Sequence, residues 1–355
     1  MRPASIVCVA PLCGSTSLRD RAVLQLQNET SLSAERAVLL DPTGTQHWVV
    51  VIKATYTIDP SGRSELAEEQ EPVCLAPVFS GTPGQSSLLR ETELTYDHPG
   101  TDVIFNASAH SRAGPVPSVD VHVEVGPVRK ALRVYGERAW ARAAFGFIPS
   151  RPIPFTTLPI CYERAFGGSA GPDGPHDERN PIGCGLKVNP GQLTDSLLPN
   201  VEDPSVPLRS RSDRPAPAGL GAISTDWSPR RTLAGTFDDR WQQTKLPLWP
   251  DDFDPRYFCA AATGLHAAAP LQGGEPVTLV GLSPEVRRFR LPREVLTVDT
   301  WIGSRHVRQS SQLDRVIIEP DARRLIMVWR SSLRCGPRFR DIVRTRVGQK
   351  LRVAK

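Results

Sequence analysis

Residues 118–126 read Ser-Val-Asp-Val-His-Val-Glu-Val-Gly, and this stretch decides the fold class. Its valines alternate with polar or charged residues, so one face of the segment is apolar and the other faces water. A two-residue period of this kind predicts a β-strand that is buried on one side. After Gly126 and Pro127 a second strand-like stretch, 128–135, follows at once. The two stretches together predict a β-meander.

Further strands are expected on both sides of this meander. Residues 47–58, His-Trp-Val-Val-Val-Ile-Lys-Ala-Thr-Tyr-Thr-Ile, begin as an unbroken apolar run and end in alternation. This pattern is typical of a central strand that emerges at the edge of a sheet. Toward the C-terminus the sequence predicts two hairpin pairs, one of 277–282 with 287–291 and the other of 313–319 with 325–329.

The expected fold is mainly β. Two antiparallel β-sandwich-like blocks cover about residues 21–150 and 270–330, and a loop-rich middle, 151–269, lies between them. Proline supplies 34 of the 355 residues, roughly twice the average share of ~5%. Because proline removes a backbone donor and fixes φ, we expect long ordered loops and few short helices, one of them near 238–245. The middle has too little periodicity to fold alone, so the blocks are expected to share one core.

The two ends of the chain differ from its body. Residues 1–20 look like an irregular leader, and 331–355 form a basic tail. Residues 329–355 hold nine Lys or Arg and one acid, while the preceding residues are nearly neutral. The tail is either solvated or docks onto an acidic partner or an anionic surface. Since the body is nearly neutral, no general nucleic-acid-binding surface is expected.

Seven scattered cysteines without a Cys-x-x-Cys pair argue against a disulfide framework and against a zinc ribbon. The seven histidines show no metal-ligand spacing, so neither a metal nor another cofactor is expected. No stretch reaches the ~20 apolar residues of a membrane span, and the N-terminal apolar run is too short for a signal peptide. We therefore expect a cytoplasmic protein without membrane insertion.

Three irregular motifs stand out in the middle segment: 162–168 (Tyr-Glu-Arg-Ala-Phe-Gly-Gly), 180–185 (Asn-Pro-Ile-Gly-Cys-Gly) and 198–204 (Leu-Pro-Asn-Val-Glu-Asp-Pro). Each combines glycine or proline, which set the backbone geometry, with charged, amide or aromatic groups. They either lock loops together or line a groove for a partner. The residues singled out are Tyr162, Glu163, Arg164, Phe166, Gly167, Gly168, Asn180, Gly183, Asn200, Glu202 and Asp203.

Glu163 and Arg164 are expected to form buried, charge-assisted hydrogen bonds that fix neighbouring loops. Removing either member of such a buried pair would leave the other unpaired, at a cost of roughly 3–5 kcal/mol. The sequence contains no phosphate loop, no GxGxxG, no HExxH and no GxSxG motif, so a hydrolase or NTPase of a common class is not expected.

An aromatic and arginine-rich stretch follows the three motifs, between residues 227 and 258. Trp, Tyr and Arg dominate the energy of protein interfaces, but a small loop-rich core uses the same residue types for filling. Either role suits this stretch. Its candidate partner-binding residues are Trp227, Arg230, Arg231, Trp241, Trp249 and Tyr257.

The chain resembles a bacterial family, the domain-of-unknown-function 2169 proteins. The resemblance spans roughly residues 21–330. It rests on the three motifs, on 234–241 (Ala-Gly-Thr-Phe-Asp-Asp-Arg-Trp) and on the shorter stretches 49–56, 99–103, 252–256, 273–275, 318–321 and 328–330. It implies a non-enzymatic adaptor or chaperone that binds an effector or spike-tip protein of a type VI secretion system and helps to load it onto the spike. The rival hypotheses are an enzyme acting on a carbohydrate-like substrate through Glu163, Glu202 or Asp203, and a structural subunit of a secreted particle.

Overall fold

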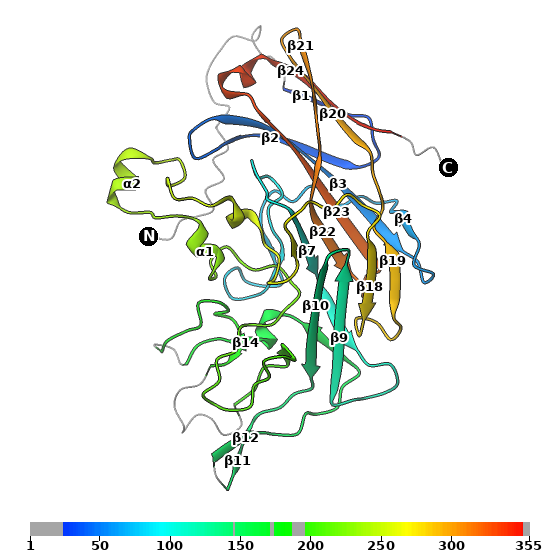
Figure 1. Cartoon of the computed structure of the whole chain (residues 1–355), viewed down its shortest axis with the longest axis vertical. Coiled ribbons are helices and arrows are strands. Elements are labelled where there is room, and N and C mark those ends of the chain that lie inside the picture. Colours follow the sequence, from blue (N-terminus) through cyan, green and yellow to red (C-terminus); the bar gives the residue numbers. More distant parts are fainter. Residues whose placement is uncertain (1–23, 145, 171–173, 187–195, 351–355) are drawn as a thin grey trace.

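The computed structural model describes residues 24–144, 146–170, 174–186 and 196–350, so the expected leader, 1–20, lies outside the described residues. The fold is mainly β, as predicted, and its few helices are short (Figure 1). The molecule is elongated, with β21 and β24 at one end and the β11–β12 hairpin at the other (Figure 1). No helix among the described residues is long and apolar enough to cross a membrane.

The largest sheet has the strand order β17-β7-β22-β23-β3-β2, with β4 paired to the end of β3. The predicted run around 47–58 forms the long strand β3 between β23 and β2, and the expected second hairpin is confirmed as β22–β23. β7 pairs with β22 in parallel, which the expected antiparallel blocks did not include. The strands are β2 (Ser33–Leu40), β3 (Gln46–Ile58), β4 (Ser64–Leu66), β7 (Thr101–Phe105), β17 (His266–Ala267), β22 (Gln312–Glu319) and β23 (Arg324–Arg334).

A second sheet has the order β16-β10-β9-β18-β19. The predicted meander is confirmed as β9 and β10, and the side chains of β9 alternate between buried and exposed. The pair β18–β19 from the C-terminal half joins this sheet because β18 pairs with β9. The two β blocks therefore interleave in one sheet. The strands are β9 (Ser118–Val125), β10 (Val128–Tyr135), β16 (Val201–Glu202), β18 (Pro276–Val280) and β19 (Arg287–Arg290).

These two sheets share one apolar core. Valines of β9 such as Val121 and Val123 lie in one cluster with Trp48, Val50 and other inward-facing residues of the large sheet. Burial of apolar area on this scale is the main stabilising term of such a sandwich. The opposite face of the large sheet carries a smaller cluster that includes Val49 and Val51.

The basic C-terminal segment is not a solvated tail over its described residues. Strand β24 (Ile342–Gln349) lies in a four-stranded sheet of order β1-β24-β20-β21, with β1 (Gln25–Asn28), β20 (Leu296–Ile302) and β21 (Arg305–Gln309). Ile342, Thr345 and Val347 are fully buried, while the arginines between them point outward. The apolar spacing of the tail is thus that of a strand with one bulged pairing, not of a helix.

The remaining elements are short, and Asp238 caps α2 by accepting a hydrogen bond from the Trp241 backbone, which confirms the helix expected there. Among the described residues they are β5 (Val78–Phe79), β6 (Leu88–Arg90), β8 (Ala107–His110), β11 (Trp140–Ala143), β12 (Gly146–Pro149), β13 (Thr157–Ile160), β14 (Phe166–Gly167), β15 (Cys184–Gly185), α1 (Arg230–Leu233), α2 (Asp239–Thr244) and the 3₁₀ turns η1 (Tyr162–Arg164), η3 (Pro255–Phe258) and η4 (Gly336–Asp341).

One buried hydrogen bond ties β24 to the main core. The indole Nε1 of Trp48 donates to Thr345 Oγ1 at 2.9 Å. We predict that Thr345→Val lowers the free energy of unfolding by about 1–3 kcal/mol, because the indole N–H loses its acceptor in a dry site. Urea unfolding checks this, with Val343→Thr on the exposed side of the same strand as control. Equal stability of Thr345→Val and wild type would show that β24 is not held through this bond.

Candidate functional site

The three sequence motifs meet in space. β14 from 162–168 pairs with β15 from 180–185, and Asn180 donates its side-chain amide to the carbonyls of Tyr162 (2.8 Å) and Phe166 (3.0 Å). The third motif joins through Asn200, whose backbone N–H donates to the Arg164 carbonyl at 2.8 Å. We call this assembly the motif cluster.

Glycines allow the close approaches in the motif cluster. Gly167 and Gly168 have φ values of 146° and 87°, and a Cβ on either would lie 2.2 Å from a backbone oxygen. At Gly183 a Cβ would meet the Asn180 amide nitrogen at 2.4 Å. A side chain at any of these positions would force the backbone apart. Tyr162 and Phe166 are both buried at 2% exposure, so these motif residues build structure.

Glu163 and Arg164 do not form the buried pair that the sequence suggested. Both side chains are only half-buried, and each binds a different neighbour because adjacent residues of η1 point apart. Glu163 accepts from the Ser87 backbone at 2.8 Å and from its hydroxyl at 2.5 Å. Arg164 donates to Asn200 at 3.1 Å and to Glu137 at 3.3 Å. Removing either side chain does not leave the other unpaired. The expected loss of roughly 3–5 kcal/mol in the free energy of unfolding therefore no longer follows.

The proposed acid/base carboxylates also have structural partners. Burial would raise the pKa of Glu163, but the bonds from Ser87 hold it below its usual value. Glu202 is buried against Arg138, whose guanidinium stacks on the Tyr135 ring 3.8 Å from its centroid. Asp203 is exposed and accepts from Ser205. A cavity of about 260 Å³ lies beside Arg164 and Asn200.

The aromatic stretch divides into buried and accessible residues. Trp227 is 2% exposed and packs edge-on against Tyr162, with ring centroids 5.1 Å apart, so it belongs to the core. Arg230 is 4% exposed. Both are therefore unavailable to a partner in the folded chain. Trp241, Trp249 and Tyr257 are half-buried, and Arg231 is exposed and pairs with Glu178 at 3.0 Å.

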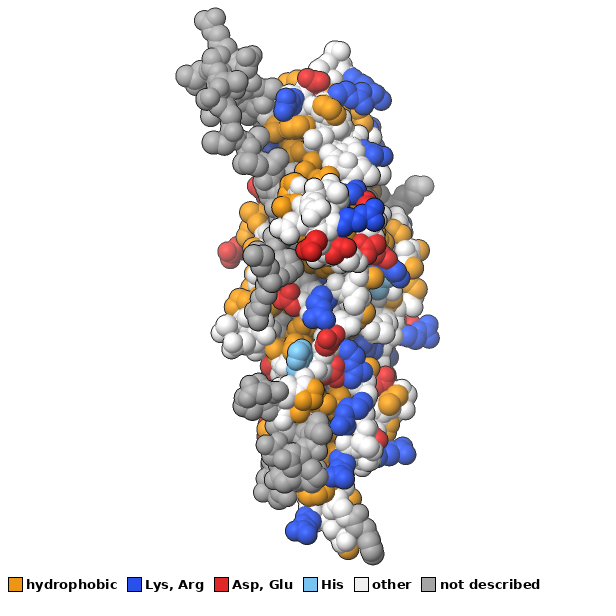
Figure 2. All heavy atoms as spheres, turned by 90° about the vertical axis from the view of Figure 1, so that its left-hand side faces the viewer, with side chains coloured by type: hydrophobic (Ala, Val, Ile, Leu, Met, Phe, Trp, Pro, Cys, Tyr) orange, Lys and Arg blue, Asp and Glu red, His pale blue; other side chains and the backbone are white. Residues whose placement is uncertain are grey.

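Two of the half-buried aromatics, Trp249 and Tyr257, border a small pocket. It has a volume of about 80 Å³, and we call it the aromatic pocket. Its apolar lining consists of Leu39, Leu40, Pro77, Leu94, Tyr96, Trp249, Tyr257 and Phe258. Trp249 lies 5.5 Å from the Tyr257 ring and 6.2 Å from the Phe258 ring, so these side chains support one another. Hydrophobic side chains are exposed among charged ones on the face that carries α1 and α2 (Figure 2).

Buried charges hold the wall of the aromatic pocket. Arg230 donates to Glu91 at 2.9 Å and to the Tyr257 carbonyl at 2.7 Å. Arg315 on β22 donates to the carbonyls of Glu91 and Thr92 at 3.2 and 2.5 Å. Two guanidinium groups thus connect the loop before β7 to η3 and to the sheet.

The same pattern extends across the large sheet. The central strands turn charged side chains toward the loop before β7, among them Lys53 on β3, Asp102 on β7, Arg315 on β22 and Arg330 on β23. We call these four residues the charged layer, and residues 67–100, which cover them, the covering segment. Lys53 pairs with Glu93 at 3.0 Å and Glu71 at 3.5 Å, and Arg330 donates to the Tyr96 carbonyl at 3.3 Å.

Asp102 lies at the centre of a polar group that the sequence did not reveal. Its carboxylate binds His98 Nε2 at 3.2 Å, His266 Nδ1 at 2.9 Å and the Ala260 N–H at 2.6 Å. Burial would raise the pKa of Asp102, but His98, His266 and their hydrogen bonds hold it far below its ordinary value. The carboxylate is therefore ionised although it is fully buried.

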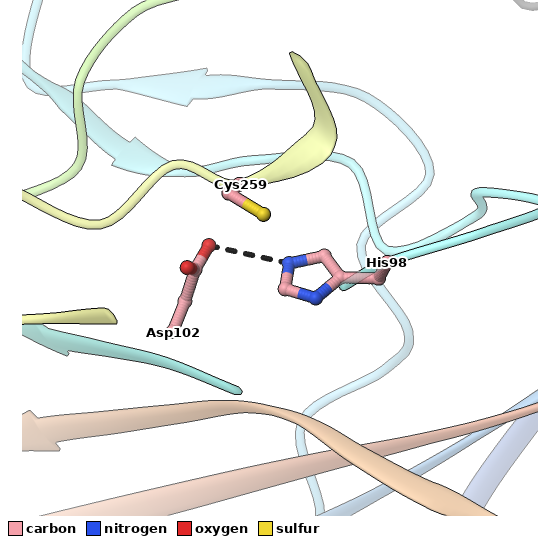
Figure 3. A group of neighbouring side chains, drawn as sticks. All are labelled: His98, Asp102 and Cys259. Carbon is pink, nitrogen blue, oxygen red and sulfur yellow. Dashed lines mark hydrogen bonds and ion pairs between the residues drawn. The ribbon is translucent and has the colours of Figure 1, made fainter. Parts of the chain in front are cut away.

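Cys259 completes this group and points toward Asp102 (Figure 3). Its thiol donates to the Pro99 carbonyl at 3.5 Å, and burial together with the nearby Asp102 raises its pKa to about 12. The thiol is therefore protonated at neutral pH and is not a nucleophile in this state. Only the four-residue interval between His98 and Asp102 was visible in the sequence. Cys259 and His266 reach the group through the fold.

Neighbouring arginines give a matched test of the buried pairs. We predict that Arg230→Ala lowers the free energy of unfolding by about 3–5 kcal/mol, because it leaves the Glu91 charge buried and unpaired. Arg231→Ala removes an exposed pair and should change it by about 0–1 kcal/mol. Urea unfolding of both variants measures the difference. Equal destabilisation would mean that Glu91 is not held as the structure shows.

Residues 43–330 match the model of a family described as "Uncharacterized protein conserved in bacteria (DUF2169)". No curated protein and no solved structure matches the chain.

Proposed function

Because the chain belongs to the DUF2169 family of bacterial proteins, we propose that it is an adaptor or chaperone of a type VI secretion system. In this role it binds a secreted effector, or the spike-tip protein that carries it, in the cytoplasm, and helps to load the effector onto the spike. The resemblance of the three motifs and of 234–241 to the family supports this role. The observation that carries it is the aromatic pocket.

The pocket suits a protein partner better than a small molecule. Ligand sites usually enclose ~300–1,000 Å³, whereas this one has about 80 Å³. That volume can receive one apolar side chain of a docking segment. Half-buried Trp and Tyr residues around such a socket are typical anchors of interface energy, because they exclude water at little cost in side-chain entropy.

The pocket is also held in shape before a partner arrives. Arg315 fixes the backbone carbonyls of Glu91 and Thr92, which form one wall. Arg230 connects the Glu91 carboxylate to the Tyr257 carbonyl on the other wall. A preformed socket lowers the entropy lost on binding. The enzyme hypothesis has less support, since Glu163, Glu202 and Asp203 already accept structural hydrogen bonds.

Substitutions around the pocket test the proposal. We predict that Tyr257→Ala and Leu94→Asp each weaken binding of the effector encoded beside this gene by about 2 kcal/mol or more, a loss of more than tenfold in affinity. Calorimetric titration of the purified effector measures the effect. Trp241→Ala serves as control, because Trp241 on α2 packs against Phe237 and does not line the pocket.

Thermal melts must first show that each variant is folded. Wild-type affinity in both folded pocket variants would contradict docking at this pocket. Absence of binding between wild-type protein and that effector, and also the encoded spike-tip protein, would contradict the adaptor role itself.

A further inference from the structure

We propose that His98, Asp102 and Cys259 bind a divalent transition-metal ion of the zinc type. The three side chains come from the end of the covering segment, from β7 and from the loop after η3, and they converge on one point (Figure 3). One ligand atom from each, Nε2 or Nδ1, a carboxylate oxygen and Sγ, lies within 4.8 Å of the others. Among the described residues, no other group of three or more His, Cys, Asp or Glu side chains has its ligand atoms this close together.

The burial and spacing of the side chains carry the argument. His98 Nε2 lies 3.2 Å from Asp102 Oδ2, and both side chains are buried, at 1% and 0% exposure. The other ring nitrogen of His98, Nδ1, lies 3.4 Å from the Gly100 carbonyl oxygen. A histidine that binds a metal commonly donates its second ring nitrogen to a backbone carbonyl in this way.

The distance between the ligand atoms of His98 and Asp102 fits a shared metal ion. Zinc ligands lie about 2.0–2.3 Å from the ion, so two nitrogen or oxygen ligands of a tetrahedral site are about 3.3 Å apart. The 3.2 Å between His98 and Asp102 agrees with this spacing. A thiolate and a carboxylate would also balance the charge of a dication. A nitrogen, oxygen and sulfur ligand set suits zinc, and it does not suit calcium or magnesium.

Hydrogen bonds from neighbouring groups already orient the Asp102 carboxylate, as they do for carboxylate ligands in metal sites. His266 Nδ1 binds Oδ1 at 2.9 Å, and the Ala260 N–H binds Oδ2 at 2.6 Å. Hydrogen bonds of this kind orient ligands in metal sites and raise affinity. With three protein ligands, the fourth position of a tetrahedral ion is left to water or another group.

Cobalt is the spectroscopic probe for the test. Untagged full-length protein is stripped with a chelator and titrated with Co²⁺, which gives a thiolate-to-cobalt charge-transfer absorption when a cysteine binds it. We expect one Co²⁺ per chain with this absorption, displaced by Zn²⁺, and an increase in Tm with Zn²⁺. A wild-type titration without the absorption overturns the proposal whether or not any variant folds.

Because the chain has seven cysteines, variants must identify the one that binds. Cys259→Ser should abolish the absorption, while Cys74→Ser should keep it. Cys74 is the matched control because it is also half-buried and its thiol also donates to a carbonyl, that of Ala76 at 3.0 Å. An unchanged absorption in Cys259→Ser overturns the site.

His266→Gln provides a second readout. It should weaken Co²⁺ binding by about 10–100-fold and leave the absorption in place, because His266 orients a ligand without touching the ion. Nitrogen NMR of His98 shows whether a proton or a metal ion lies between His98 Nε2 and Asp102. Loss of the Nε2 proton on adding Zn²⁺ supports the metal, and a ring that stays doubly protonated at saturating Zn²⁺ overturns it.

Discussion

The structure depends on buried ion pairs between a β-sheet and the irregular chain that covers it. The four residues of the charged layer point away from the main apolar core, toward the covering segment. Removing these charges from water is costly, so each must meet an opposite charge or a hydrogen-bonding group of the backbone. Lys53 meets Glu93, and Arg315 meets backbone carbonyls of the covering segment. Arg330 meets Asp314 of β22 as well as a carbonyl of that segment. Asp102 meets His98 and the Ala260 N–H. With few regular elements of its own, that segment is fixed by these contacts.

This constraint connects the scaffold to the proposed function. The aromatic pocket lies where the covering segment meets η3, and its two walls are joined through Arg230 and Arg315. The charged layer also includes Asp102, so the proposed metal site belongs to the same layer. In the motif cluster, hydrogen bonds fix the irregular chain in place of ion pairs. Asn180 and Asn200 connect loops that lie apart in the sequence. Loops fixed in this way can present a binding surface of defined shape.

Local patterns in the sequence predicted the elements that depend on local chemistry: the alternation in β9, the hairpin β22–β23 and the short helix near 238–245. What the sequence could not show depends on distant partners. A lysine inside an apolar strand does not reveal that Glu93 neutralises it, and Arg230 resembles an interface residue until Glu91 is placed beside it. Similarly, the arginines of β24 suggested a solvated tail. The contact that buries this strand, between Thr345 and Trp48, joins residues that lie far apart in the sequence. The residues of the motif cluster were found as sequence motifs, but their partners and the group around Asp102 were visible only in the fold.

Native-state hydrogen exchange of Lys53→Met tests the role of the charged layer most directly. The substitution keeps an apolar stem in the sheet and leaves the buried Glu93 without its cation, whereas Glu71 keeps Arg324 at 2.8 Å. Removal of one member of a buried pair costs about 3–5 kcal/mol, and local opening concentrates such a loss where contacts are few. The account predicts faster exchange of the amides of residues 71–97, with β9 and β10 still protected, and no change in Arg63→Met, whose partner Glu65 is exposed. Wild-type protection of residues 71–97 in Lys53→Met would contradict it.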